Sequence, residues 1–200
     1  ALAMTLLARD LGLKEIIIPL ENVKEASIVE GVDIIGVRTL LEAIHHIGRM
    51  QVISPVSPRG LETRQTSGDS FVMIKGQEYA KRALTVAAAG SHNILMAGSP
   101  GSGKTLLARA LSELLPPLSL HEALEVAKIY SAVGLIKDAK VTADRPFRNP
   151  HHTTSPAAIV GGGTYPKPGE ISLAHRGVLF LDELPEFARN VLEALRQPLE

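Results

Sequence analysis

The chain has 200 residues, of which 45% are hydrophobic and 21% charged, a composition typical of a globular protein with one domain or parts of two. Its formal net charge is +0, so no global charge draws it to nucleic acid or an anionic membrane, although a local basic patch is compatible with that value. There is no cysteine, which excludes disulfides, thiolate catalysis and zinc–thiolate sites. No apolar run reaches the roughly 18–20 residues that span a bilayer. We expect a cytoplasmic protein without membrane contact.

Residues 1–50 alternate helix and strand signals. A leucine-rich helix ends at Gly12, short apolar strands cover residues 16–18 and 32–37, a short helix covers 22–26, and another helix ends at Gly48. This α/β pattern is too short to bury a core alone. Both ends of the chain fall inside helix-like patterns, so we expect a piece of a longer protein.

Residues 51–70 are rich in Pro, Ser, Gly and Thr and lack apolar periodicity, which predicts an interdomain linker. A second α/β pattern covers 71–200. It predicts a helix over about 77–89, a strand at 93–97, a strand at 178–181 and a helix from Val191. Ser119 and Glu122 form a capping box that opens a helix to about Tyr130. A further helix after the glycine loop is predicted to face inward with Leu106, Leu107, Ala110, Leu111 and Leu114.

The sequence Gly98-Ser-Pro-Gly-Ser-Gly-Lys-Thr105 matches the phosphate-loop pattern G-x-x-x-x-G-K-[ST]. Its glycines let backbone N–H groups turn inward as an anion nest, and the following helix directs its positive end at the phosphates. Lys104 would bind the β- and γ-phosphates and Thr105 would bind Mg²⁺. The alternative is a glycine-rich turn with an exposed lysine. The expected nucleotide contacts of the loop are Gly98, Ser99, Pro100, Gly101, Ser102, Gly103, Lys104, Thr105 and Leu106.

An apolar strand ends in two carboxylates, Asp182 and Glu183. In phosphate-loop ATPases the first acid holds Mg²⁺ and the second activates the attacking water. Both would emerge at the carboxyl end of a parallel strand, where such sheets bind ligands. The alternative is a helix N-terminus whose dipole stabilises the acids. We therefore expect Asp182 as a metal ligand, and Glu183 and Lys104 as catalytic residues.

Three stretches beside the phosphate loop carry a family resemblance. They are Lys75-Gly-Gln-Glu-Tyr-Ala-Lys-Arg-Ala-Leu, Arg145-Pro-Phe-Arg-Asn-Pro-His-His-Thr-Thr-Ser and Pro168-Gly-Glu-Ile-Ser-Leu-Ala-His-Arg-Gly. Together they resemble the magnesium-chelatase-related AAA+ ATPases, and among them the bacterial ComM/YifB group. The resemblance covers essentially the whole chain. It implies the C-terminal part of a Lon/S5-like α/β domain at 1–50, the linker, and the first part of an AAA+ parallel sheet with flanking helices at 71–200.

The resemblance also implies functional details. Ile74, Gly76 and Gln77 would lie near the adenine of ATP. Residues 157–175 would form a pore insert of a hexameric ring, in which Tyr165 and Lys167 touch DNA by stacking and charge. A plain surface loop is the alternative. Ala1–Thr5 contain no lysine where Lon proteases have a catalytic one, so a structural or partner-binding role is implied for that domain.

Two pairs of residues stay open at this stage. His151 and His152 are adjacent, so they point to different sides of most backbones, and no third metal ligand is evident. A packing or inter-subunit role is favoured over a metal site. Arg145 and Arg148 could serve phosphates or a neighbouring subunit.

The resemblance implies a DNA branch-migration helicase that acts in recombination during natural transformation, with ATP and Mg²⁺ as cofactors. The alternatives are the motor subunit of a magnesium or cobalt chelatase, and a nucleotide-dependent binding module without turnover. Sensor, arginine-finger and lid residues are expected beyond Glu200. Residues 1–200 alone are therefore expected to hydrolyse ATP negligibly.

Overall fold

The computed structural model describes residues 1–58, 60, 69–136, 141–163 and 165–196. By their internal contacts, the residues form two compact units: Ala1–Glu62 with Ala123–Thr142, and Thr63–Glu122 with Ala143–Glu200. None of the helices in the described ranges is long and apolar enough to cross a membrane.

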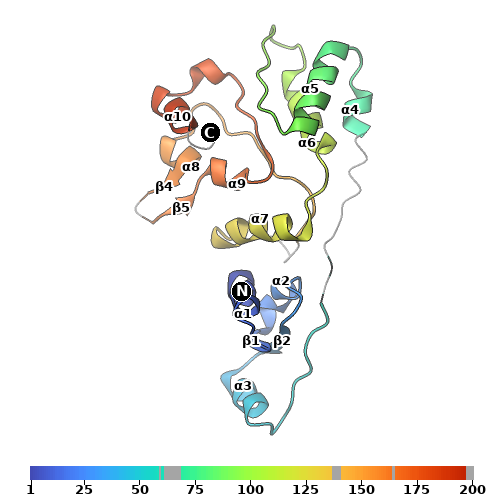
Figure 1. Cartoon of the computed structure of the whole chain (residues 1–200). Helices are drawn as coiled ribbons and strands as arrows, with labels where there is room; N and C mark the ends of the chain where they lie inside the picture. Colours follow the sequence, from blue (N-terminus) through green and yellow to red (C-terminus); the bar gives the residue numbers. More distant parts are fainter. Residues whose placement is uncertain (59, 61–68, 137–140, 164, 197–200) are drawn as a thin grey trace. The chain divides into compact units, whose positions relative to one another are not determined.

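The first unit is built on a two-stranded parallel sheet (Figure 1). Strand β1 (Glu15–Pro19) pairs with β2 (Asp33–Val37) over five residues of each strand, with Ile17 opposite Ile35. The helices of residues 1–50 are α1 (Leu2–Asp10), the 3₁₀ turn η1 (Leu20–Asn22), α2 (Val23–Ala26) and α3 (Leu40–Ile47), and most of α7 (Leu120–Ala132) belongs to the same unit. The predicted elements of residues 1–50 are therefore confirmed. Apolar side chains of β1, β2 and α2 form the core of this part. They are Ile18, Val23, Ala26 and Ile34.

Helix α3 begins after the N-cap residue Thr39, and side chains bond the backbone at its start. The Thr39 hydroxyl accepts the Glu42 N–H at 3.2 Å, and the Glu42 carboxylate accepts the Arg38 N–H at 2.7 Å. The helix buries Ala43 and His46, whereas its large apolar residues are exposed. Those exposed residues are Leu40, Leu41, Ile44 and Ile47.

The segment predicted as a linker is bonded to the first unit over its first residues. Ile53 N–H donates to His46 Nδ1 at 3.0 Å, and Val56 N–H donates to the Ile34 carbonyl at 3.0 Å. Residue 59 and residues 61–68 lie outside the described part. Helix α4 (Asp69–Met73) then begins.

In the second unit, α4 packs with α5 (Glu78–Gly90) and α6 (Lys104–Leu114) around Leu84, Leu107 and Leu111 (Figure 1). Helix α5 agrees with the range predicted for it, and α6 is the helix predicted after the glycine loop. The inward prediction is wrong for Leu106, whose side chain is 65% exposed. The neighbouring positions Leu107, Ala110 and Leu111 complete the buried face, so the 3.6-residue period directs Leu106 outward.

The strand predicted at 93–97 is not formed. Ile94 and Met96 of this apolar run are partly buried against the Leu84 cluster. A strand also needs a hydrogen-bonding neighbour, and none of the strand pairs among the described residues includes this segment. The segment is therefore a loop that leads into the phosphate-binding sequence.

Helix α7 (Leu120–Ala132) confirms the predicted capping box and continues two residues past the expected end. The Ser119 hydroxyl accepts the Glu122 N–H at 3.3 Å, while the Glu122 carboxylate accepts both the N–H and the hydroxyl of Ser119 at 3.0 Å. The reciprocal bonds satisfy donors that a helix start leaves unpaired.

The remainder of the second unit contains two short ladders. Strand β3 (Phe147–Arg148) pairs in parallel with β6 (Val178–Leu179), and β4 (Gly161–Gly162) pairs antiparallel with β5 (Lys167–Pro168). Helices α8 (Pro156–Val160), α9 (Glu170–Leu173) and α10 (Arg189–Ala194) and the 3₁₀ turn η2 (Leu184–Glu186) accompany them (Figure 1). Their core contains Ile159, Phe187 and Val191.

The strand predicted at 178–181 is confirmed only for its first two residues. Phe180 N–H still donates to the Arg148 carbonyl at 2.8 Å, and Leu181 packs on the Ile159 core. The partner strand β3 ends at Arg148, so pairing stops there. The acidic residues that follow therefore stand beyond the ladder, at the carboxyl end of β6.

Candidate nucleotide-binding site

The phosphate loop leads directly into α6. Gly101 and Gly103 have φ angles of +77° and +87°, a region that residues with a Cβ adopt only at a cost, and Gly103 is the N-cap residue of α6. No side chain caps the start of α6. The N–H groups of its first turn are thus left for an anion, as a phosphate site requires.

Lys104 folds back over the loop that precedes it. Its ammonium donates to the carbonyl oxygens of Gly98 and Ser99, both at 3.0 Å. The cation is therefore held at the loop by backbone dipoles rather than by a carboxylate among the contacts described. A positive charge placed beside free N–H groups strengthens anion binding.

Thr105 and Asp182 meet although they are 77 residues apart in the sequence. The Thr105 hydroxyl donates to Asp182 Oδ2 at 3.1 Å. A hydroxyl and a carboxylate are hard oxygen ligands of the kind that Mg²⁺ prefers, and Mg²⁺ usually keeps several waters besides such ligands. The pair fits a magnesium ion bound together with nucleotide phosphates.

Glu183 follows in a left-handed backbone conformation, with φ 53° and ψ 48°, and it caps the short turn η2. Such a conformation costs a residue other than glycine about 1–2 kcal/mol. The Glu183 N–H donates to Asp182 Oδ1 at 3.1 Å, so both oxygens of Asp182 accept a hydrogen bond. The alternative prediction is that the two acidic residues stand at a helix N-terminus. The structure has only the three-residue turn η2 after Glu183.

The Glu183 carboxylate lies beside a histidine. His152 Nδ1 is 3.3 Å from Glu183 Oε2. Reasoning from sequence missed this pair, since the two residues are 31 positions apart and no local pattern joins them. The only signal in the sequence was the adjacent pair of histidines. Among the described residues, no three or more His, Cys, Asp or Glu side chains are grouped so that they could hold a metal ion.

The residues expected near adenine lie beside the loop in part. The Gln77 side-chain amide is 3.5 Å from the Ser102 carbonyl, and both Gly76 and Gln77 have positive φ angles. Ile74 packs on the Leu84 cluster. The loop that precedes α6 contains the other three predicted contacts, Ser99, Pro100 and Ser102.

Arg145 and Arg148 are engaged within the second unit. Arg145 donates to the carbonyls of Pro116 at 2.6 Å and Arg176 at 2.7 Å. Arg148 makes a two-pronged ion pair with Glu170, at 2.5 and 2.7 Å. These bonds connect the region of β3 to the residues after α6, to the residues before β6 and to the first residue of α9.

Glu122 has a pKa below its usual range. The chief cause is the hydrogen bond from the Ser119 backbone N–H, followed by the bond from the Ser119 hydroxyl; the guanidinium groups of Arg145 and Arg176 also contribute. Those two groups lie 3.9 and 3.7 Å from Glu122 Oε1. The start of α7 therefore favours an ionised carboxylate.

The insert predicted over 157–175 contains α8, the hairpin of β4 and β5, and α9. The hairpin extends away from α8 and α10 (Figure 1). Tyr165 is 83% exposed, and Lys167 is also exposed. Residue 164 lies outside the described part.

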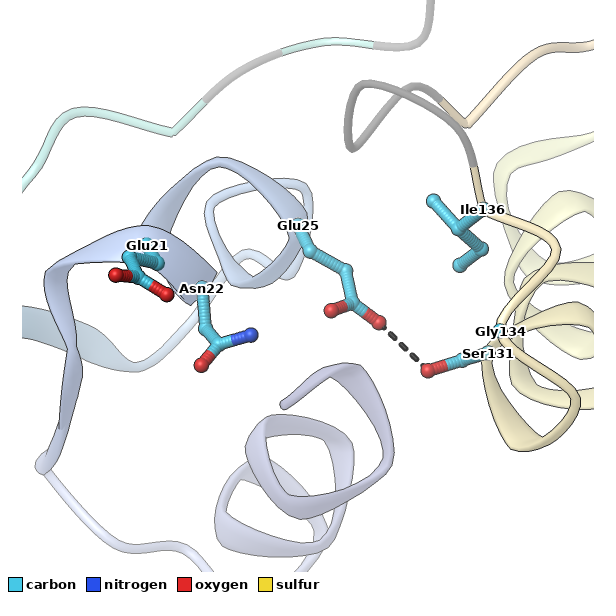
Figure 2. Close-up of a pocket in the computed structure, with 6 residues that line it drawn as sticks. All are labelled: Glu21, Asn22, Glu25, Ser131, Gly134 and Ile136. Atoms are coloured by element: carbon cyan, nitrogen blue, oxygen red, sulfur yellow. Dashed lines mark hydrogen bonds between the residues drawn. The ribbon is translucent and has the colours of Figure 1, made fainter.

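A separate hollow of about 240 Å³ belongs to the first unit (Figure 2). Glu25 accepts a hydrogen bond from the Ser131 hydroxyl at 2.7 Å beside it. None of the residues predicted to bind nucleotide lines it. The lining residues are Glu21, Asn22, Glu25, Ser131, Gly134 and Ile136.

Comparison with known proteins relates both parts of the sequence to families. Residues 70–200 match the family described as magnesium chelatase, subunit ChlI. The competence protein ComM of Haemophilus influenzae is 47% identical over 203 aligned residues, which cover 98% of this chain and 39% of that protein. An uncharacterised YifB protein of Escherichia coli is 46% identical over 94% of this chain and 37% of its own length.

A shorter similarity concerns proteases. An archaeal Lon protease of Halobacterium salinarum is 49% identical over 49 residues, which are 24% of this chain and 7% of that protein. The chain spans about two fifths of the length of the ComM and YifB relatives. The expected α/β fold, with a Lon-like and an AAA+ part, is thus confirmed. By the match over residues 70–200, the chain belongs to the magnesium chelatase subunit ChlI family and is of the AAA+ ATPase type.

Proposed function

We propose that residues 71–200 bind MgATP and form the catalytic part of an ATP-hydrolysing motor. The observation that carries this proposal is the 3.1 Å hydrogen bond between Thr105 and Asp182. It joins the phosphate loop to the acidic strand end, two motifs that ATP hydrolysis needs at one place.

Each residue then has a role in the proposed site. The backbone N–H groups of residues 98–106 bind the phosphates, except at Pro100, which has no N–H and shapes the loop. Lys104 neutralises charge on the β- and γ-phosphates. Thr105 and Asp182 hold the metal, which when bound offsets charge that develops on the phosphates. Glu183 accepts a proton from the attacking water. Ile74, Gly76 and Gln77 line the adenine side.

The domain division is part of the same proposal. Residues 1–50 form the end of a Lon-like domain, 51–70 a linker, and 71–200 the first part of an AAA+ domain. The matches to Lon protease and to the chelatase family support it.

We further propose that the whole protein is a cytoplasmic, ring-forming hexamer that migrates DNA branches in recombination during natural transformation. The name of the competence protein ComM supports the last point. The exposed Tyr165 and the exposed Lys167 offer one ring and one cation to a strand of DNA.

Two other functions remain candidates for the same motor. The family description favours the motor subunit of a magnesium or cobalt chelatase. A nucleotide-dependent binding module without turnover is the third candidate. Branch-migration assays on four-way junctions with the full-length protein separate the first candidate from both others, and ATP turnover separates the chelatase motor from the binding module.

Nucleotide titration tests the binding claim. We expect Lys104→Ala to weaken the binding of a fluorescent ATP analogue at least about tenfold, because a charged partner of the phosphates is lost. Lys24→Ala removes an exposed lysine of α2 and serves as the control. Equal affinity of wild type and Lys104→Ala would refute nucleotide binding at this loop.

A further inference from the structure

We propose that His152 is a positioning residue that holds the Glu183 carboxylate for ATP hydrolysis. This inference rests on the proposed function, in which Glu183 accepts the proton of the attacking water. It adds a residue that the sequence motifs of the site do not include.

The contact itself joins one nitrogen and one oxygen. His152 Nδ1 lies 3.3 Å from Glu183 Oε2, with exposed side-chain fractions of 27% and 66%. In the tautomer that carries the proton on Nδ1, the ring can donate a hydrogen bond to the carboxylate without being charged. The positioning role therefore does not require an imidazolium.

The His152 ring is fixed by aromatic neighbours. Phe187, which is 4% exposed within the Ile159 core, meets it edge-on at 6.5 Å and 81° between the ring planes. The ring of His151 lies 4.1 Å away on centroids. Because Phe187 is part of a core, the imidazole has a firmer support than a surface side chain has.

Glu183 gains from such a partner because its carboxylate is largely exposed. Its backbone is restrained, by the left-handed conformation and by the bond from its N–H to Asp182, but its side chain is 66% exposed. A general base must lie within about 2.6–3.2 Å of the proton it accepts. A carboxylate free to rotate in water spends little time there, so one fixed donor raises the fraction of productive orientations.

The fold explains how His152 reaches this place. It follows β3 by four residues, and Arg148 at the end of β3 is paired with Leu179 of β6. Both strands run in parallel, so the residues after β3 and after β6 leave the ladder at the same edge. The Arg148–Glu170 ion pair anchors that end of β3.

Kinetics of the full-length protein test the proposal. We expect His152→Ala to lower kcat about 10- to 100-fold, the loss typical of removing a partner that orients a functional group. The Kd for a fluorescent ATP analogue should not change, because His152 contacts no residue of the phosphate loop among those described. His152→Asn places an amide N–H near the position of Nδ1 and should recover most of kcat.

Two controls separate positioning from mere stabilisation. His45→Ala removes a histidine of α3, in the first unit, and should keep kcat within about twofold of wild type. In a Glu183→Gln background, His152→Ala should cause no further loss, because the two residues act as one unit. The thermal unfolding midpoint of each variant monitors folding.

The outcomes distinguish this inference from the function on which it rests. A wild type that hydrolyses ATP and a His152→Ala variant with unchanged or higher kcat would overturn the role of His152 alone. A further loss of kcat on adding His152→Ala to the Glu183→Gln background would overturn that role too. Absence of hydrolysis by wild type would overturn the proposed function itself, and the positioning role with it.

Discussion

The two parallel ladders of the molecule differ in how they are held together. In the first unit, β1 and β2 pair over five residues each, and Ile18 and Ile34 are buried against Val23 and Ala26 of α2. In the second unit, β3 and β6 pair over only two residues each, yet the proposed metal ligand Asp182 and the proposed base Glu183 follow closely after β6. Side-chain bonds supplement the short ladder, namely those of Arg145, Arg148 and Thr105. The comparison indicates that the first sheet depends mainly on buried packing, whereas polar side-chain bonds supplement the packing of the second.

The largest effect should come from the core of the first unit. Ile34→Ala removes a side chain that is 2% exposed, and we expect it to lower the free energy of unfolding by about 2–5 kcal/mol. Ile47→Ala, at a position that is 69% exposed, is the matched control and should change it by less than about 0.5 kcal/mol. Chemical denaturation measures both. Equal losses would show that burial does not determine stability at this ladder.

The polar bonds of the second ladder should come next. Arg148→Ala leaves the part-buried Glu170 without its two-pronged partner, and we expect a loss of about 1.5–3 kcal/mol in denaturant unfolding. Arg189→Ala removes an exposed i,i+4 pair with Glu193 and should cost only about 0.3–0.5 kcal/mol. If both variants lose the same amount, the Arg148 pair does not stabilise β3 more than a surface pair would.

The smallest effect should come from the partly exposed carboxylate of Glu122. Because its pKa is lowered in the folded protein, chiefly by the Ser119 N–H, its ionisation stabilises the fold above the unfolded-state pKa. That contribution is lost as the pH falls through the lowered folded-state pKa. Glu122→Gln should therefore be less stable than wild type near neutral pH, and the difference should shrink in acid.

Thermal unfolding of wild type and Glu122→Gln would measure this difference in stability. A range of about pH 2–7 includes the pH values at which carboxylates titrate. Ser119→Ala removes the second cause of the pKa shift and should reduce the pH dependence without abolishing it. A difference between wild type and Glu122→Gln that does not change with pH would contradict this explanation.

Local patterns determined several elements of this protein. The glycines of the phosphate loop, the start of α6, the capping box of α7 and the strands β1 and β2 all lie where sequence reasoning predicts them. In each case the signal comes from residues a few positions apart, namely a required positive φ, a side chain that caps its own helix, or an apolar run.

Other features depend on residues distant in sequence. Three differences from the predictions depend on which helix faces are buried and which strand edges are paired. They are the exposure of Leu106, the absence of a strand at 93–97 and the end of β6 at Leu179. The same is true of the intramolecular bonds of Arg145 and Arg148, which the sequence left open.

The sequence alone determined that this chain has a phosphate loop and an acidic strand end, because each motif is contiguous and its chemistry lies in its residue types. Only the tertiary structure decided that Thr105 meets Asp182 and that Glu183 faces His152. The reason is physical: these contacts depend on the carboxyl ends of β3 and β6 sharing one sheet edge, and strand pairing between distant segments leaves no local pattern in the sequence.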